Sequence, residues 1–113
     1  MKYSQRDIVE VNFLFPDGTL KVHPAIIVSN DELQKDEFGL VYLVLITSNL
    51  DLNSKYSYLL TNGMLLSHSF SKPSVVKCQI IAGYTERDII RRLGAVKKKY
   101  FDEIVDKVIE SVF

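Results

Sequence analysis

The chain lacks most of the residue patterns that specialised chemistry requires. Cys78 is the only cysteine among 113 residues, so no internal disulfide can form. His23, His68 and Cys78 are far apart in the sequence and show no metal-ligand spacing. The 5 glycines are scattered, which excludes a glycine-rich phosphate loop, and no G-x-S-x-G elbow occurs. We therefore expect neither a metal nor a cofactor.

Long hydrophobic runs are also missing. The longest apolar run, residues 40–46, is far shorter than the roughly 20 residues of a membrane-spanning helix. The N-terminal residues do not resemble a signal peptide. Apolar residues make up 47% of the chain and charged residues 25%, the usual mixture of a soluble globular protein. These features predict one cytoplasmic domain over residues 1–113.

Neither sign of charge dominates, since 14 basic and 14 acidic residues give a net charge of zero. The distribution is uneven, because residues 72–99, here called the basic segment, carry 8 basic and 2 acidic residues. Such an excess can attract a phosphate backbone through counterion release. A solvated helix face with a lysine-rich loop explains the same pattern, and for residues 97–99 this second interpretation is favoured. Alone, the basic segment is a weak signal.

The first two thirds of the chain read as β-structure. Along residues 7–15, polar positions tend to alternate with apolar ones, and β-branched side chains are frequent, which predicts a strand. Pro16-Asp17-Gly18 then predicts a hairpin turn. Residues 40–47 are apolar on both faces, which predicts a central strand. Residues 31–37 and 51–57 are polar and predict connections. The other expected strands are residues 20–29, 58–60 and 74–82, with a turn at 61–63.

Helical patterns occur only near the end of the chain. Thr85 and Asp88 resemble a capping box, which predicts a short helix up to Gly94. A clearer apolar stripe follows at helical spacing and predicts a terminal helix packed on the strands. Because the stripe continues to the last residues, we expect these to be buried. Its members are Phe101, Ile104, Val105, Val108, Ile109 and Val112.

A few polar residues stand at strand positions that stability alone does not require. His23 lies in an apolar strand, Thr47 and Ser48 end the most apolar strand, and Lys77 and Gln79 share one face of the last strand. If these strand ends converge, an imidazole, a hydroxyl and an ammonium group surround one point. That set suits a phosphodiester, because a cation stabilises the oxyanion and imidazole moves protons near neutral pH. Ordinary surface or locally hydrogen-bonded roles are more common for each of these residues, so spacing alone does not establish an active site.

The order of several motifs resembles the MazF/PemK toxin family. Residues 6–13 (R-D-I-V-E-V-N-F) and 23–31 (H-P-A-I-I-V-S-N-D) are similar to its G-D-I-V-x-V-x-F and R-P-A-L-V-V-S-N-D motifs. Residues 45–49 (L-I-T-S-N) resemble its P-I-T-S motif. Residues 75–80 (V-V-K-C-Q-I) resemble the V-V-R-C-D-Q segment of the PemK branch, and residues 85–94 resemble its short helix and the R-L-x-x-x-[IL]-G region after it.

The resemblance implies a mainly β fold with a C-terminal helix, an SH3-like small antiparallel barrel of the PemK/MazF/CcdB type, which forms a homodimer. It also implies a toxin paired with an antitoxin: a metal-independent, sequence-selective endoribonuclease that cleaves single-stranded RNA, including mRNA. In that chemistry the RNA 2′-hydroxyl attacks and leaves a 2′,3′-cyclic phosphate. Thr47 stands at the catalytic Thr and Lys77 at a functional Arg of the PemK branch. The residues expected to contact RNA are Lys21, Ser48, Lys72 and Gln79.

This sequence departs from the family pattern at a central position. His23 replaces the catalytic Arg of R-P-A, so an imidazole that titrates near neutral pH stands where the family has a permanent planar cation. The acidic residue before Gln79 is missing, and the first loop is short. Either His23 acts as acid, base and partial oxyanion stabiliser, helped by Lys21 or Lys77, or strong RNase activity is lost.

Two binding functions remain as alternatives. A CcdB-type toxin poisons DNA gyrase through its C-terminal residues, and burial of the apolar stripe would weigh against that function. A small barrel could also bind RNA through the basic segment without cleaving it. Leu65, Leu66 and Phe70 either belong to an interface or simply cap the barrel.

Overall fold

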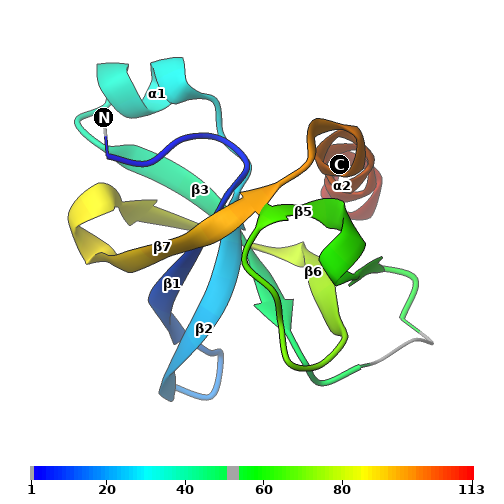
Figure 1. Cartoon of the computed structure of the whole chain (residues 1–113). Coiled ribbons are helices and arrows are strands. Elements are labelled where there is room, and N and C mark those ends of the chain that lie inside the picture. Colours follow the sequence, from blue (N-terminus) through cyan, green and yellow to red (C-terminus); the bar gives the residue numbers. More distant parts are fainter. Residues whose placement is uncertain (1, 51–53) are drawn as a thin grey trace.

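Seven antiparallel strands form one curled sheet in the computed structural model, which describes residues 2–50 and 54–113 (Figure 1). The strands are β1 (Asp7–Leu14), β2 (Leu20–Ile27), β3 (Leu40–Thr47), β4 (Ser57–Leu60), β5 (Leu65–Ser67), β6 (Ser74–Thr85) and β7 (Ile89–Val96). Their order across the sheet is β4-β6-β3-β2-β1-β7-β5. The predicted mainly β class with a C-terminal helix is confirmed.

The β1–β2 hairpin follows directly from the sequence. Alternating burial along Asp7–Leu14 places one set of side chains on each face of the sheet, and β1 pairs with β2 from Ile8↔Ile26 to Leu14↔Leu20. In the turn, Asp17 accepts hydrogen bonds from the backbone N–H and the hydroxyl of Thr19. Both bonds lower the pKa of the exposed Asp17 carboxyl, and the bond from the Thr19 hydroxyl has the larger effect.

Strand β3 has a neighbour on each side, as its apolar sequence predicts. It pairs with β2 through Ala25↔Leu45 and with β6 through Thr47↔Val75. Between Val44 and Leu45 the pairing with β6 shifts, so part of β6 forms an irregularity opposite β3. Two cores result, one on each face of the curled sheet, with Ile26 and Val44 in one and Ala25 and Leu43 in the other.

Helix α2 (Lys98–Val112) covers the first of these cores. Its buried residues are Phe101, Ile104 and Val108, and α2 contacts β6. The Tyr58 hydroxyl on β4 also donates a hydrogen bond of 3.0 Å to Glu103 Oε1 on the helix. The pKa of Tyr58 is raised to about 12, mainly by burial and next by this hydrogen bond to Glu103. The predicted packing of the terminal helix is therefore confirmed.

The side chains at the end of α2 are exposed, although the sequence predicted that they are buried. Ile109 is 52% exposed, Val112 43% and Phe113 90%, although they continue the apolar stripe. Ile109 and Val112 are thus only about half covered by the described part of the chain, and Phe113 is almost fully exposed. The burial that weighed against a gyrase-binding function is therefore absent.

Two connections also differ from the prediction. Residues 31–37 contain a short helix, α1 (Asp31–Asp36), whose first turn is capped by Asn30 Oδ1 accepting from the Leu33 N–H at 2.8 Å. The three residues 51–53 of the polar segment 51–57 lie outside the described residues. The predicted turn at 61–63 contains a 3₁₀ turn, η1 (Asn62–Met64).

The predicted short helix over residues 85–94 is wrong. The Thr85–Asp88 capping box does form, but it caps only the 3₁₀ turn η2 (Glu86–Asp88). The chain then continues as β7, which pairs with β1 on one side and β5 on the other. Pairing with these two strands determines the structure here, and Ile89 and Val96 at the two ends of β7 are buried. No helix in the described residues is long and apolar enough to cross a membrane.

Candidate functional site

A cavity of about 370 Å³ opens where the middle of β2 and the end of β3 meet the chain before β6. We call it the His23–Thr47 cavity; its polar lining residues are His23, Thr47, Ser48, Ser71, Lys72 and Ser74, and its other lining residues are Val22, Pro24, Ile46 and Phe70. Four of the residues predicted from the sequence therefore meet at one place: His23, Thr47, Ser48 and Lys72.

Sheet register explains why His23 and Thr47 meet. Ala25 pairs with Leu45, so the same antiparallel register, continued by two residues, brings His23 next to Thr47 on the same face. The atoms agree with this placement, since His23 Nδ1 lies 3.4 Å from the carbonyl oxygen of Ile46. The strand ends bring together an imidazole and a hydroxyl from positions 24 residues apart in the sequence.

Two contacts orient the imidazole. A carbonyl oxygen can only accept, so the Ile46 contact favours the tautomer with a proton on Nδ1 and leaves Nε2 able to accept one. The ring also meets Phe15 edge-on, with centroids 5.2 Å apart and planes at 66°. His23 is half-buried, and one side of its ring is therefore held by apolar surface.

Thr47 is half-buried and Ser48 is exposed at the end of β3. The Thr47 hydroxyl accepts a hydrogen bond of 3.2 Å from the backbone N–H of Asn49. This bond leaves the hydroxyl proton free to be donated into the cavity. The end of β3 thus offers two hydroxyl groups, of which one has a fixed position.

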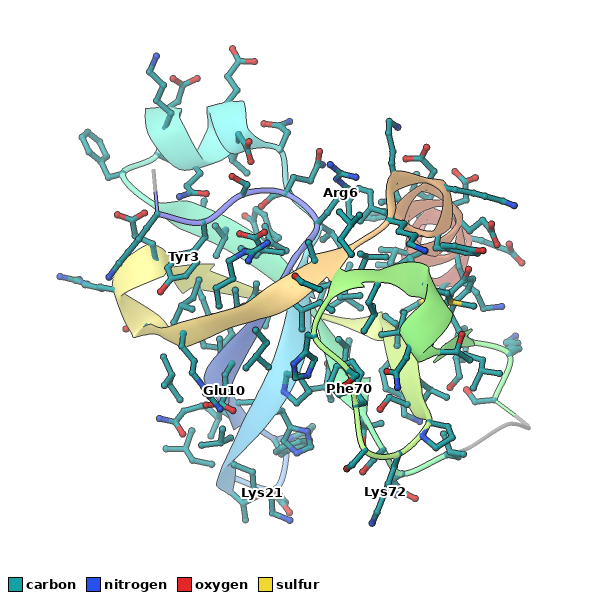
Figure 2. The ribbon with its side chains drawn as sticks, in the orientation of Figure 1. Tyr3, Arg6, Glu10, Lys21, Phe70 and Lys72 are labelled. Atoms are coloured by element: carbon teal, nitrogen blue, oxygen red, sulfur yellow. The ribbon has the colours of Figure 1, made fainter. Side chains whose placement is uncertain are left out.

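The remaining predicted residues lie outside the lining of this cavity, within the part of the chain described. Lys77 is half-buried and pairs with Leu45, so it shares a face with Thr47 but stands two positions away along the strands. Lys21 is exposed and pairs with Phe13, two residues before His23. Gln79 is exposed at the irregularity of β6. Lys21 and Lys72 point toward the same end of the molecule (Figure 2).

Much of the basic segment is neutralised within the protein. Arg91 Nε lies 3.2 Å from Glu10 and Arg92 Nε lies 3.0 Å from Asp7. The Lys98 ammonium pairs with Asp102 at 2.8 Å, and the Lys97 ammonium donates to the Gly63 carbonyl oxygen. Four of the eight basic residues therefore have partners in the fold, which reduces the charge available for a phosphate backbone.

Some lining residues were not predicted as functional. Ser74 is buried and its hydroxyl donates to the Lys72 carbonyl oxygen at 3.3 Å. Its place directly after Pro73, at the first residue of a strand, is the signal that could have indicated it. Phe70 lines the cavity and also packs on the core beneath α2, whereas Leu65 is buried in that core and Leu66 is 62% exposed.

The described residues show no group of three His, Cys, Asp or Glu side chains that could hold a metal ion. Cys78 is buried, and its burial raises the pKa of the thiol to about 11, which keeps it neutral. The chemistry available at the His23–Thr47 cavity is therefore that of imidazole, hydroxyl and ammonium groups.

Solved structures with the same fold include several bacterial toxins. MazF from Deinococcus radiodurans is 15% identical, with a TM-score of 0.77 over 97% of this chain and 96% of that chain. A MazE-MazF structure from the same organism is 16% identical, with a TM-score of 0.74 over all of both chains. A mycobacterial endoribonuclease, solved in complex with its cognate antitoxin, is 14% identical, with a TM-score of 0.66 over 96% and 93%.

The sequence itself decides the family. No curated protein matches the chain. The model of the PemK-like, MazF-like toxins of type II toxin-antitoxin systems, however, matches residues 4–112, nearly the whole chain. Endoribonuclease activity is typical of that family. The chain therefore belongs to the PemK-like, MazF-like family of type II toxin-antitoxin toxins.

Proposed function

We propose that the protein is an endoribonuclease toxin that cleaves single-stranded RNA, mRNA included, in the His23–Thr47 cavity, without a metal. The observation that carries the proposal is the meeting of His23, Thr47, Ser48 and Lys72 around one cavity at the strand ends. Family membership supports the reaction class, and the structural neighbour from a mycobacterium, itself an endoribonuclease, agrees with it.

The proposed reaction is an internal transesterification. The 2′-oxygen of one nucleotide forms a bond to the adjacent phosphorus while the bond from phosphorus to the 5′-oxygen breaks. His23 Nε2 takes the proton of the 2′-hydroxyl and then gives that proton to the leaving 5′-oxygen, so that the products are a 2′,3′-cyclic phosphate and a 5′-hydroxyl. Atoms and charge balance without an external nucleophile.

The surrounding groups stabilise the charge that develops on the phosphate oxygens. Thr47 donates its free hydroxyl proton to an oxygen, and Ser48 contacts the substrate beside it. Lys72 holds the phosphate backbone at the cavity rim, with Lys21 and Gln79 as further RNA contacts. Lys77 acts from the same face of the sheet, as the family's Arg position implies. In this scheme His23 supplies acid–base catalysis at the position that corresponds to the family's Arg, a permanent cation.

The proposal includes the partners typical of such toxins. The toxin acts in the cytoplasm as a homodimer and is neutralised by a cognate antitoxin. The solved MazE-MazF complex and the mycobacterial complex with antitoxin support this assignment, since both share the fold of this chain over nearly its full length.

The test is cleavage of a long defined RNA by purified protein in EDTA, with 5′ ends mapped by primer extension. His23→Ala and Thr47→Ala should each lower the cleavage rate at least about 100-fold, the usual effect of removing a positioned acid–base or charge-stabilising group. Thr85→Ala is the matched control, because Thr85 lies at the opposite end of the β3–β6 pair. Absence of discrete cuts by a folded wild-type protein would overturn the proposal.

A second function is favoured by one observation, the exposed apolar side chains of the last turn of α2. In a CcdB-like mode these residues would bind DNA gyrase, and no RNA would be cut. Inhibition of gyrase supercoiling that is lost in Phe113→Ala but kept in Thr47→Ala would assign this function. Cleavage in EDTA without gyrase inhibition would exclude it.

A further inference from the structure

The side chain of Asn62 holds the backbone of Phe70 at two points. Asn62 Nδ2 donates to the Phe70 carbonyl oxygen at 3.1 Å, and the Phe70 N–H donates to Asn62 Oδ1 at 2.8 Å. Asn62 is exposed and lies in η1, eight residues before Phe70. The Asn62 amide thus satisfies both the N–H and the carbonyl oxygen of Phe70, which belongs to no strand. A neighbouring strand would make the same two bonds.

Other contacts fix Phe70 further. The ring packs on the core beneath α2 and meets His68 at a centroid distance of 4.7 Å with planes at 86°. His68 has a left-handed φ of 78°, a conformation that histidine adopts more readily than most side chains. An aromatic ring at the surface is therefore held in one place by an amide clamp, a core contact and an edge contact.

Phe70 stands between two cavities. It lines the His23–Thr47 cavity and also a second cavity of about 220 Å³, the Asn62 cavity, whose other lining residues are Leu60, Thr61, Asn62, Ser71, Lys72 and Pro73. Ser71 and Lys72 line both cavities as well, so a cation and a hydroxyl accompany the ring at the boundary. Phe70 lies above Lys72 in the view of Figure 2.

We infer that Phe70 is a stacking surface for one nucleobase of single-stranded RNA, and that Asn62 is a positioning residue that holds it there. The inference rests on the proposed RNA-cleaving function. The His23–Thr47 cavity takes the reacting phosphate, and a nearby base stacks on Phe70 toward the Asn62 cavity, while Lys72, which lines both cavities, pairs with a backbone phosphate at their boundary. Aromatic rings bind the π-faces of unpaired bases, and a duplex keeps those faces covered, so this surface selects single strands.

Binding measurements separate stacking from charge. The probe is a short fluorescein-labelled single-stranded RNA of randomised sequence, and the protein carries Thr47→Ala so that the probe stays intact. Phe70→Ala should weaken binding about tenfold and leave the slope of log K against log salt unchanged, whereas Phe70→Tyr should keep the affinity. Lys72→Ala should reduce that slope by about 0.7, the contribution of one phosphate contact on a single strand. Phe38→Ala, at a ring that is 94% exposed beside α1, is the matched control and should bind as the parent.

A double-mutant cycle tests the role of Asn62. Asn62→Ala should weaken binding alone but add little in the Phe70→Ala background, because its effect passes through the ring. Equal effects in both backgrounds would contradict the positioning role. If the wild-type protein binds and cuts RNA but the folded Phe70→Ala variant binds the probe as tightly as its parent, the stacking inference is overturned and the proposed function is not. A wild-type protein that neither binds nor cuts RNA would overturn the proposed function as well.

Discussion

His23 on β2 and Ile46 on β3 meet through one contact of 3.4 Å, from the imidazole Nδ1 to the backbone carbonyl oxygen. This contact turns the opposite ring nitrogen away from the strand at a position where the family has an arginine. An arginine there supplies charge but cannot exchange its proton near neutral pH. The replacement therefore predicts a difference in pH behaviour rather than only in rate.

The first prediction concerns the pH dependence of cleavage. The wild-type rate should change between pH 5 and pH 8, since imidazole is the ordinary side chain that gains or loses a proton in this range. His23→Arg should remove this pH dependence from any cleavage that it retains, because guanidinium stays charged throughout the range. Initial rates of RNA cleavage across this range provide the measurement. A flat wild-type profile would contradict an acid–base role for His23.

The second prediction concerns Cys78. Burial raises the pKa of this thiol from 9.0 to about 11, so the folded protein holds the thiol proton more tightly than the unfolded chain. The stabilisation from this group is complete below pH 9 and is lost as pH rises towards 11. Cys78 should therefore react with a thiol reagent at pH 8 only after denaturant unfolds the chain. Rapid stoichiometric labelling of the native protein would contradict the burial.

The third prediction compares two glycines. A Cβ at Gly94 on β7 would overlap the Ser67 carbonyl oxygen and approach His68 Cβ to 2.7 Å, whereas a Cβ at Gly63 would meet nothing within 4 Å. Gly94→Ala should lower the free energy of unfolding by about 1–3 kcal/mol, the usual cost of overpacking. Gly63→Ala is the control and should stay near the wild type in urea unfolding. Equal stability of the two variants would mean that β5 does not lie against Gly94.

The fourth prediction compares two ion pairs of the basic segment. Asp7 is buried, pairs with Arg92 at 3.0 Å and accepts from the Ser4 N–H at 2.8 Å. Asp7→Ala should therefore destabilise the protein by about 2 kcal/mol. Glu10→Ala removes the more exposed pair with Arg91 and should cost less than about 1 kcal/mol. Thermal or urea unfolding measures both, and a larger loss in Glu10→Ala would contradict the burial difference.

The parts of the fold that were predicted correctly have a periodic signal. The alternation in β1, the two apolar faces of β3 and the helical stripe of α2 as far as Val108 each correspond to burial in the structure. Where the sequence signal was local, tertiary contacts produced a different secondary structure from the predicted one. The Thr85–Asp88 capping box formed its hydrogen bonds, yet pairing with β1 made the following residues a strand. A local motif cannot report a partner strand that lies far away in the sequence.

The candidate site shows the same division. The sequence indicated His23 inside an apolar strand and Thr47 at the end of another as unusual polar residues, and the continued β2–β3 register brings them together at one cavity. It could not indicate the Asn62–Phe70 clamp, because the amide of a turn residue meets a loop backbone only after η1 and the chain before β6 have folded. Nor could it show that three of the eight basic residues of the basic segment form ion pairs within the fold, or that Lys97 donates to the Gly63 carbonyl oxygen.

The most direct measurement of the central claim identifies the ends left by cleavage. An RNA that contains a site mapped with the wild-type protein is cut in EDTA, and the fragments are analysed by mass spectrometry. A matched substrate carries a 2′-deoxynucleotide at the cut position. The proposed transesterification predicts a 2′,3′-cyclic phosphate and a 5′-hydroxyl from the RNA, and no cut at the deoxy position. Cleavage of the deoxy substrate, or fragments with a 3′-hydroxyl and a 5′-phosphate, would contradict it.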